Sequence, residues 1–114
     1  MESQPREIEL YVTPEGKVPF SEWLKSLKDS RARAVIRARL IRVRLGNLGD
    51  CRSVGAGVFE LRIDFGSGFR VYFGQEGNDI VVLLCGGDKG SQEKDIRKAK
   101  EYWSDYRSRE NAEK

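Results

Sequence analysis

Between Val58 and Lys89, apolar and polar positions predict three strands separated by glycine-rich turns. In 58–65 every second residue is apolar, which is the period of a half-buried strand. The alternation resumes over 69–73 after a Gly-Ser-Gly turn, so these two runs predict a hairpin. The run 79–85 is apolar almost throughout and is typical of a strand that is covered on both faces.

The predicted hairpin has one apolar face and one polar face. If the phenylalanines on either side of the Gly-Ser-Gly turn pair with each other, Asp64 lies opposite Arg70. The same register places Arg62 opposite Tyr72. The polar face would then carry Arg62, Arg70 and Tyr72 together.

The rest of the chain predicts one more strand and three helices. They are a strand over 7–12, helices from Pro19 to residue 28 or 29, from 30 to 45 and from 91 to 107, and a loop over 47–56. Gly46 is placed to cap the second helix, and Trp23 and Trp103 lie on apolar helical stripes that favour core packing. Residues 1–6 and 108–114 are predicted to be flexible tails.

The order strand, helix, helix, three strands, helix predicts one α+β domain over residues 1–114, with an ordered core of about 7–107. A chain of this length is long enough for one hydrophobic core. We expect an antiparallel sheet of about four strands, with two N-terminal helices on one face and a C-terminal helix. The first strand is expected beside the Val58–Phe65 strand or at that edge.

Composition excludes several classes of protein. With 39% hydrophobic and 34% charged residues, the chain is typical of a small globular protein rather than a disordered one. It has no apolar run of the ~20 residues that a membrane helix needs, and its start has no apolar leader, so we expect a cytoplasmic protein. Cys51 and Cys85 favour two buried thiols over a disulfide.

No cluster of side chains has metal-ligand spacing, so neither a metal nor a cofactor is predicted. The turn Gly86–Ser91 is rich in glycine but lacks the spacing of a nucleotide-binding loop. The chain also contains no histidine. Any catalysis would therefore proceed without the usual acid–base residue of neutral pH.

Positive charge is concentrated between residues 28 and 52. The net charge is only +3, but this segment holds eight cations against Asp29 and Asp50. The cations are Lys28, Arg31, Arg33, Arg37, Arg39, Arg42, Arg44 and Arg52. Such a local field attracts polyanions or an acidic protein. Two interpretations stay open: Arg37, Arg44 and Arg52 bind RNA or ribosome phosphates, or the arginines form a solvated face that meets an acidic partner.

Five short segments together resemble a known family. They are Phe20–Leu24, Gly46–Asp50, Gly57–Ile63, Gly66–Phe73 and Leu83–Lys89. In this order they resemble the RelE/ParE superfamily of toxin–antitoxin toxins, in its HigB-like addiction module killer protein branch. The resemblance implies a RelE-like fold, a toxic activity and a small cognate antitoxin, typically with a DNA-binding helix-turn-helix. Many members of the superfamily cleave mRNA in the ribosomal A site, and the ParE branch poisons DNA gyrase instead.

Arg62 and Arg70 match the arginines of the family's ELR and GxRVY segments. RNA cleavage through the 2′-hydroxyl needs cations on the pentacoordinate phosphorane, and arginine grips phosphate oxygens with a two-pronged fork. We therefore expect both arginines to hold the phosphate. The alternative is that Arg70 pairs with Asp64 while Arg62 is simply solvated.

Proton transfer needs another group, because arginine is too weak an acid to act as a base at neutral pH. Lys89 follows two glycines that could bring it toward the sheet face, or it is an ordinary loop lysine in solvent. Tyr72 could stack on an exposed base or transfer a proton, or it packs across the strands. Glu60 shares the polar face and is expected to form a salt bridge.

The leading hypothesis is therefore a metal-independent endoribonuclease that acts on mRNA at the ribosome and is neutralised by an antitoxin. Its catalytic residues would be Arg62, Arg70, Lys89 and Tyr72, and its partners the ribosome, mRNA and antitoxin, with no membrane. Two alternatives remain at this point. The chain could be a non-enzymatic gyrase inhibitor of the ParE type, or an inactive remnant that only binds an antitoxin.

Overall fold

The structure is a computed structural model that describes residues 5–112. Its elements in chain order are β1 (Glu7–Leu10), α1 (Pro19–Ser26), α2 (Ser30–Arg44), β2 (Cys51–Gly55), β3 (Val58–Ile63), β4 (Phe69–Glu76), β5 (Ile80–Asp88), the 3₁₀ turn η1 (Lys89–Ser91) and α3 (Gln92–Ala112). The predicted strands and helices are therefore present. The flexible tails predicted at 1–4 and 113–114 lie outside the described residues. Residues 108–112 continue α3, so the prediction of a flexible segment there is wrong.

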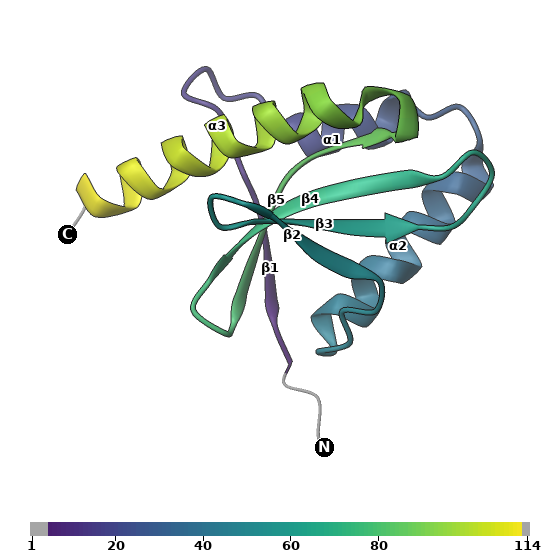
Figure 1. Ribbon diagram of the computed structural model, residues 1–114, viewed down its shortest axis with the longest axis horizontal. Helices are drawn as coiled ribbons and strands as arrows, with labels where there is room; N and C mark the ends of the chain where they lie inside the picture. Colours follow the sequence, from purple (N-terminus) through teal and green to yellow (C-terminus); the bar gives the residue numbers. More distant parts are fainter. Residues whose placement is uncertain (1–4, 113–114) are drawn as a thin grey trace.

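The strands form one sheet in the order β1-β5-β4-β3-β2 (Figure 1). β1 runs parallel to β5, and the other neighbours are antiparallel. The α+β class is confirmed, but the predicted antiparallel sheet of about four strands is corrected to a mixed sheet of five. β1 does not lie beside β3 as expected. It pairs with β5 instead, so that the apolar β5 has a strand on each side and helices on both faces.

β2 forms within the segment that was predicted to be a loop. Its main chain pairs with β3, Arg52 facing Glu60, although its side chains do not alternate between buried and exposed. The pairing is irregular between Ser53 and Gly55. An edge strand of this kind is held by main-chain hydrogen bonds rather than by a hydrophobic face, so periodicity gives no signal for it.

The sheet is covered on both faces. Figure 1 shows α3 on the near side of the sheet and α1 and α2 behind it. The core on the α1 and α2 side contains Phe20, Leu24, Ile36, Val43, Leu61, Ile63, Val71, Phe73, Val81 and Leu83. The core on the α3 side contains Tyr11, Val58, Tyr72, Val82, Leu84, Cys85, Ala99 and Trp103. Odd-numbered residues of β3 and β4 thus face α1 and α2, and even-numbered residues face the α3 side.

The β3–β4 hairpin has a different register from the predicted one. Arg62 lies opposite Arg70, and Ile63 lies opposite Phe69. The chain leaves the ladder after Ile63, so the connection comprises residues 64–68 rather than the Gly-Ser-Gly turn alone. The actual register differs by two residues from the predicted one, which leaves every side chain on its predicted face.

Several local predictions are confirmed. Gly46 has a positive φ of 98° just after α2, the conformation that favours glycine at a helix end. Trp103 is buried and Trp23 is half-buried against the core. Cys51 and Cys85 are free thiols, of which Cys85 is buried and Cys51 half-buried. No helix of residues 5–112 is both long and apolar enough to span a membrane.

Candidate active site

Glu60 lies at the centre of the polar face of the hairpin and is fully buried. In the sheet it is flanked by Arg52 of β2 on one side and Tyr72 of β4 on the other. The neighbouring cross-strand pair is Arg62 and Arg70. Because alternate residues of a strand share a face, these five side chains lie together on the α3 side of the sheet.

Three arginines converge on the Glu60 carboxylate. The Nε atom of Arg52 lies 2.9 Å from Oε1, and that of Arg62 lies 3.3 Å from the same oxygen. The Nε of Arg70 is 3.7 Å from Oε2, close enough for an ion pair but too far for a hydrogen bond. Oε2 also accepts from the Tyr72 hydroxyl at 3.0 Å and from Gln92 Nε2 at 2.8 Å. We call these residues the Glu60 cluster: Arg52, Glu60, Arg62, Arg70, Tyr72 and Gln92.

The cluster presents positive charge to solvent. The side chains of Arg52 and Arg62 are 51% and 41% exposed, whereas that of Arg70 is 12% exposed. Since each arginine approaches Glu60 through Nε, its two terminal amino groups are left for other partners. Three guanidinium groups against one carboxylate give the cluster a net charge of 3 − 1 = +2. The arrangement suits an anion with several oxygens.

The hydrogen bonds hold Glu60 in its ionised form. Burial by itself raises the pKa of the Glu60 carboxyl, but the hydrogen bonds from its arginine, glutamine and tyrosine partners outweigh burial, and the pKa lies below its ordinary value. Burial and the hydrogen bond to Glu60 raise the pKa of the Tyr72 hydroxyl. Tyr72 therefore stays protonated at neutral pH and acts as a hydrogen-bond donor to Glu60.

The lowered pKa of Glu60 predicts acid-sensitive stability. A carboxyl whose pKa is lower in the folded chain stabilises the fold above its unfolded pKa, about 4.3, and this contribution is lost as pH falls through the folded value. We expect the free energy of unfolding, measured by urea denaturation between about pH 6 and 3, to fall more steeply below about pH 4.3 in the native chain than in Glu60→Gln. Equal slopes for the two proteins would remove Glu60 as the source.

Two predictions about the polar face are wrong. The stacking expected of Tyr72 requires an exposed ring, but the tyrosine is fully buried beneath the arginines and α3. Arg70 does not pair with Asp64 either, because the register places it opposite Arg62 and its ion pair is with Glu60. The salt-bridge role expected of Glu60 is confirmed.

Lys89 lies at the end of the sheet beyond Arg70. Arg70 pairs with Gly87, and the chain continues through Asp88 into the turn η1, where Lys89 is exposed. Asp88 fixes this turn by accepting hydrogen bonds from the main-chain N–H groups of Gly90 and Ser91. No hydrogen bond or ion pair within residues 5–112 joins Lys89 to the Glu60 cluster. Lys89 thus lies near the cluster in sequence and fold, with its ammonium group still free to move.

The glycines before Lys89 serve packing rather than chain direction. A Cβ atom at Gly86 would overlap the ring of Trp23, and one at Gly87 would overlap the carboxylate of Asp95. Glycine is therefore required because α1 and α3 approach the backbone of β5 from opposite faces. The expectation that these residues bring Lys89 toward the sheet face is replaced by this steric reason.

The three arginines predicted to bind RNA outside the catalytic set do not share one surface. Arg37 and Arg44 are exposed on α2, which covers the face of the sheet opposite the Glu60 cluster. Arg52 belongs to the cluster itself. Arg39, on the same helix, is buried and donates a hydrogen bond to the Leu48 carbonyl oxygen, so it holds the loop after α2.

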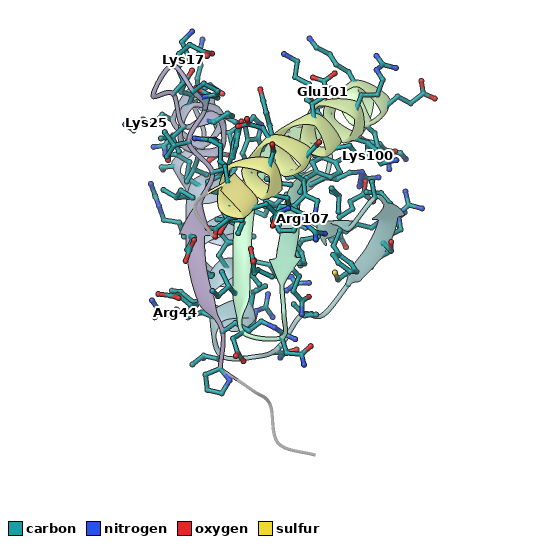
Figure 2. The ribbon with its side chains drawn as sticks, turned by 90° about the vertical axis from the view of Figure 1, so that its left-hand side faces the viewer. Lys17, Lys25, Arg44, Lys100, Glu101 and Arg107 are labelled. Carbon is teal, nitrogen blue, oxygen red and sulfur yellow. The ribbon has the colours of Figure 1, made fainter. Side chains whose placement is uncertain are left out.

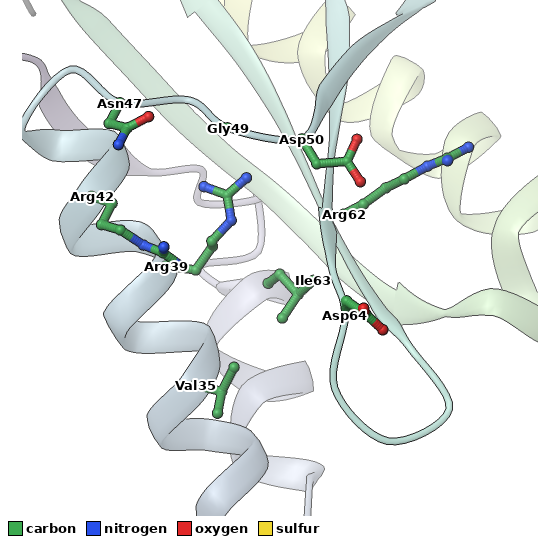
Figure 3. Close-up of a pocket in the computed structure, with 9 residues that line it drawn as sticks. All are labelled: Val35, Arg39, Arg42, Asn47, Gly49, Asp50, Arg62, Ile63 and Asp64. Carbon is green, nitrogen blue, oxygen red and sulfur yellow. The ribbon is translucent and has the colours of Figure 1, made fainter.

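A cleft of about 310 Å³ adjoins the cluster at the end of β3. It is lined by Val35, Arg39, Arg42, Asn47, Gly49, Asp50, Arg62, Ile63 and Asp64. Figure 3 shows that Arg62 directs its guanidinium group away from Arg39 and Arg42. The two aspartates also bring negative charge to this cleft, so it is a mixed-charge neighbour of the cluster rather than part of its anion-binding surface.

Sequence reasoning missed two members of the cluster. Gln92 belongs to α3, 32 residues from Glu60, and no local pattern predicts their hydrogen bond. Arg52 was expected to bind RNA separately, because its strand was interpreted as a loop. The alternation of Glu60 and Arg62 along β3 was the usable signal for the centre of the site. Within residues 5–112, no group of three histidine, cysteine or acidic side chains could hold a metal ion.

Comparison with known proteins covers most of the chain. A family model described as phage derived protein Gp49-like matches residues 22–104, which include the entire Glu60 cluster and Lys89. An uncharacterized protein of Haemophilus influenzae is 54% identical over 81 residues, which amount to 71% of this chain and 82% of that protein. The candidate active site therefore lies inside the part of the chain that defines the family.

Proposed function

Because this chain belongs to the Gp49-like family of phage-derived proteins, a RelE-like toxin family of toxin–antitoxin systems, we propose that it is a toxin that cleaves mRNA on the ribosome. In this proposal it belongs to the HigB-like branch, acts in the cytoplasm and is neutralised by a small helix-turn-helix antitoxin. The observation that carries the proposal is the Glu60 cluster, where a buried carboxylate gathers three arginines and leaves two of them open to solvent.

The cluster would hold the scissile phosphate. When the 2′-oxygen attacks phosphorus, negative charge develops on the phosphorane oxygens, and preorganised cations stabilise that charge. Arg62 and Arg52 offer terminal amino groups from the solvent side, and Arg70 adds positive potential from beneath. Because Glu60 already fixes all three guanidinium groups, little ordering is left to occur when RNA binds.

Lys89 would supply the proton for the leaving group. An ordinary lysine is protonated at neutral pH, so it suits the acid that protonates the departing 5′-oxygen better than the base that deprotonates the 2′-hydroxyl. Lys89 is exposed in η1, beyond the Arg70 end of the sheet, where a phosphate on the arginines would bring RNA near it. Tyr72 and Glu60 would act as positioning residues. Arg37 and Arg44 would add sequence-independent attraction to RNA from α2.

The proposal is tested by inducing this chain alone in a bacterial host and mapping transcript 5′ ends within minutes. We expect new ends inside translated codons, and we expect them to disappear when translation initiation is blocked beforehand. Growth arrest with intact transcripts and damaged DNA would replace the proposal with gyrase inhibition. Harmless overproduction of the folded chain would indicate a remnant that only binds its antitoxin.

A further inference from the structure

The exposed large apolar side chains of the described residues gather along one edge of the sheet. They are Leu10 at 45% exposure, Val12 at 40%, Ile41 at 49% and Leu45 at 60%. The first two lie in or just after β1. The other two lie at the end of α2, which is joined to the start of β1 by a hydrogen bond from Arg6 N–H to the Arg44 carbonyl. Figure 2 shows Arg44 beside this edge strand. An apolar patch of this kind marks an interaction surface.

β1 is an edge strand with unused main-chain groups. In a parallel ladder, alternate residues direct both their N–H and C=O toward the same neighbour. Glu7 and Tyr11 donate to carbonyls at 79 and 83 at the two ends of the β5 pairing, so Ile8 and Leu10 direct theirs outward. The next outward carbonyl, that of Val12, accepts a hydrogen bond from Arg109 of α3. The open part of the edge is therefore short and centred on Ile8 and Leu10.

Two clefts flank this open edge. One, of about 400 Å³, is lined by Glu7, Ile8, Leu40, Ile41 and Arg44. The other, of about 220 Å³, is lined by Leu10, Val12, Tyr106, Arg109 and Glu110. A strand added to β1 would direct alternate side chains to opposite sides of the sheet and so reach both clefts.

Charge argues against a second copy of this chain as the occupant. A two-fold axis pairs β1 with itself in the antiparallel sense, because a parallel ladder needs a stagger that the axis does not supply. Pairing Ile8 with Ile8 places Glu7 opposite Glu9, and pairing Ile8 with Leu10 places Glu9 opposite Glu9. Like charges directly opposite each other destabilise a ladder. Pairing Leu10 with Leu10 would need the main chain of Val12, whose carbonyl Arg109 already occupies.

We propose that an extended segment of the antitoxin adds to the sheet along β1, with basic residues opposite Glu7 and Glu9 and apolar residues between them. This inference rests on the proposed function only in taking the partner to be an antitoxin. β1 is separated from β3 by β5 and β4, so the bound segment would leave the Glu60 cluster uncovered. Neutralisation would then come from the bulk of the antitoxin, which keeps the toxin off the ribosome.

The test uses the protein encoded by the gene adjacent to that of this chain, mixed with the purified full-length chain in the absence of ribosomes and RNA. We expect hydrogen exchange at the Ile8 and Leu10 amides to slow in the complex. We also expect Leu10→Lys and Ile41→Lys each to raise the Kd by about tenfold or more, since each places a cation at the apolar contact beside a basic segment. The matched control is Ser53→Lys, which puts the same residue at an exposed position of the opposite edge strand β2.

Each outcome bears on the inference separately from RNA cleavage. A complex in which the β1 amides exchange as in the free chain, and in which Leu10→Lys and Ile41→Lys bind as tightly as Ser53→Lys, would overturn it. A free chain that is dimeric with slowed exchange at Ile8 and Leu10 would overturn it in favour of a second copy. A chain that cleaves no RNA but shows slowed exchange and weakened binding would support this surface and refute only the proposed activity.

Discussion

Replacing Arg62 with alanine is expected to reduce mRNA cleavage by about 10²–10³-fold while the chain remains folded. Arg62 is 41% exposed and is anchored to Glu60 through Nε, so its terminal amino groups are free for phosphate. Alanine removes those donors where negative charge develops in the transition state. Arg62→Lys should restore only part of the activity, because a single ammonium group cannot bind both Glu60 and a phosphate with a planar fork. The measurement is the rate of appearance of new 5′ ends in a reconstituted translation reaction.

Arg37→Ala is the matched control for this experiment. Arg37 is also an exposed arginine, but it lies on α2 on the opposite face of the sheet from Glu60. The two variants therefore lose the same charge and differ in its position. Similar circular dichroism spectra and thermal midpoints would show that both are folded. If Arg62→Ala cleaved at the native rate, or if Arg37→Ala lost as much activity, the Glu60 cluster could not be the catalytic centre.

The apolar periodicity predicted most of the elements because burial imposes it. The strands around Leu61 and Val71 alternate, since one face packs on α1 and α2 while the other carries the cluster. β2 was missed for the converse reason. Arg52 and Ser53 are both exposed, and main-chain pairing with β3 leaves no mark on the side-chain pattern.

The hairpin shows which part of a register a sequence can specify. Alternation fixes the face to which each side chain points, but a slip of two residues leaves all faces unchanged. The Gly-Ser-Gly sequence suggested a tight turn, whereas the chain leaves the ladder at Ile63 and crosses a longer loop. The polar face was therefore predicted with its correct members, and its pairing was not. Arg62 faces Arg70 rather than Tyr72, and this pair explains why a buried carboxylate is needed beside them.

The centre of the site depended on tertiary contacts that no local pattern contains. Glu60 accepts from β2, β3, β4 and α3 at once, and two of these partners, Arg52 and Gln92, lay in segments whose placement was not predicted. The placement of β1 at the far edge was equally hidden, because its pairing with β5 joins segments about 70 residues apart. The consequence is that residue types on the polar face were predictable and the agent that organises them was not.

Neutralising Glu60 is expected to damage both stability and activity. In Glu60→Gln the three guanidinium groups lose their shared anion and repel one another. Arg52 and Arg62 can turn toward solvent, but Arg70 is only 12% exposed and would be left as a buried, uncompensated cation. Breaking a buried pair in this way costs about 3 kcal/mol, so we expect the free energy of unfolding in urea at pH 7 to fall by that amount. A change below about 0.5 kcal/mol would contradict the role given to Glu60.

A second substitution separates the stability effect from the effect on activity. Because the cost in Glu60→Gln comes mainly from stranded charge on Arg70, adding Arg70→Leu should recover about 1–3 kcal/mol, which a double-mutant cycle with Arg70→Leu alone would measure as coupling. The double variant should nevertheless remain inactive, since Arg52 and Arg62 no longer share an anchor and would have to be ordered when RNA binds. Recovered stability together with recovered cleavage would reduce Glu60 to a folding element. Recovered stability without cleavage is the result expected if Glu60 positions the arginines for phosphate.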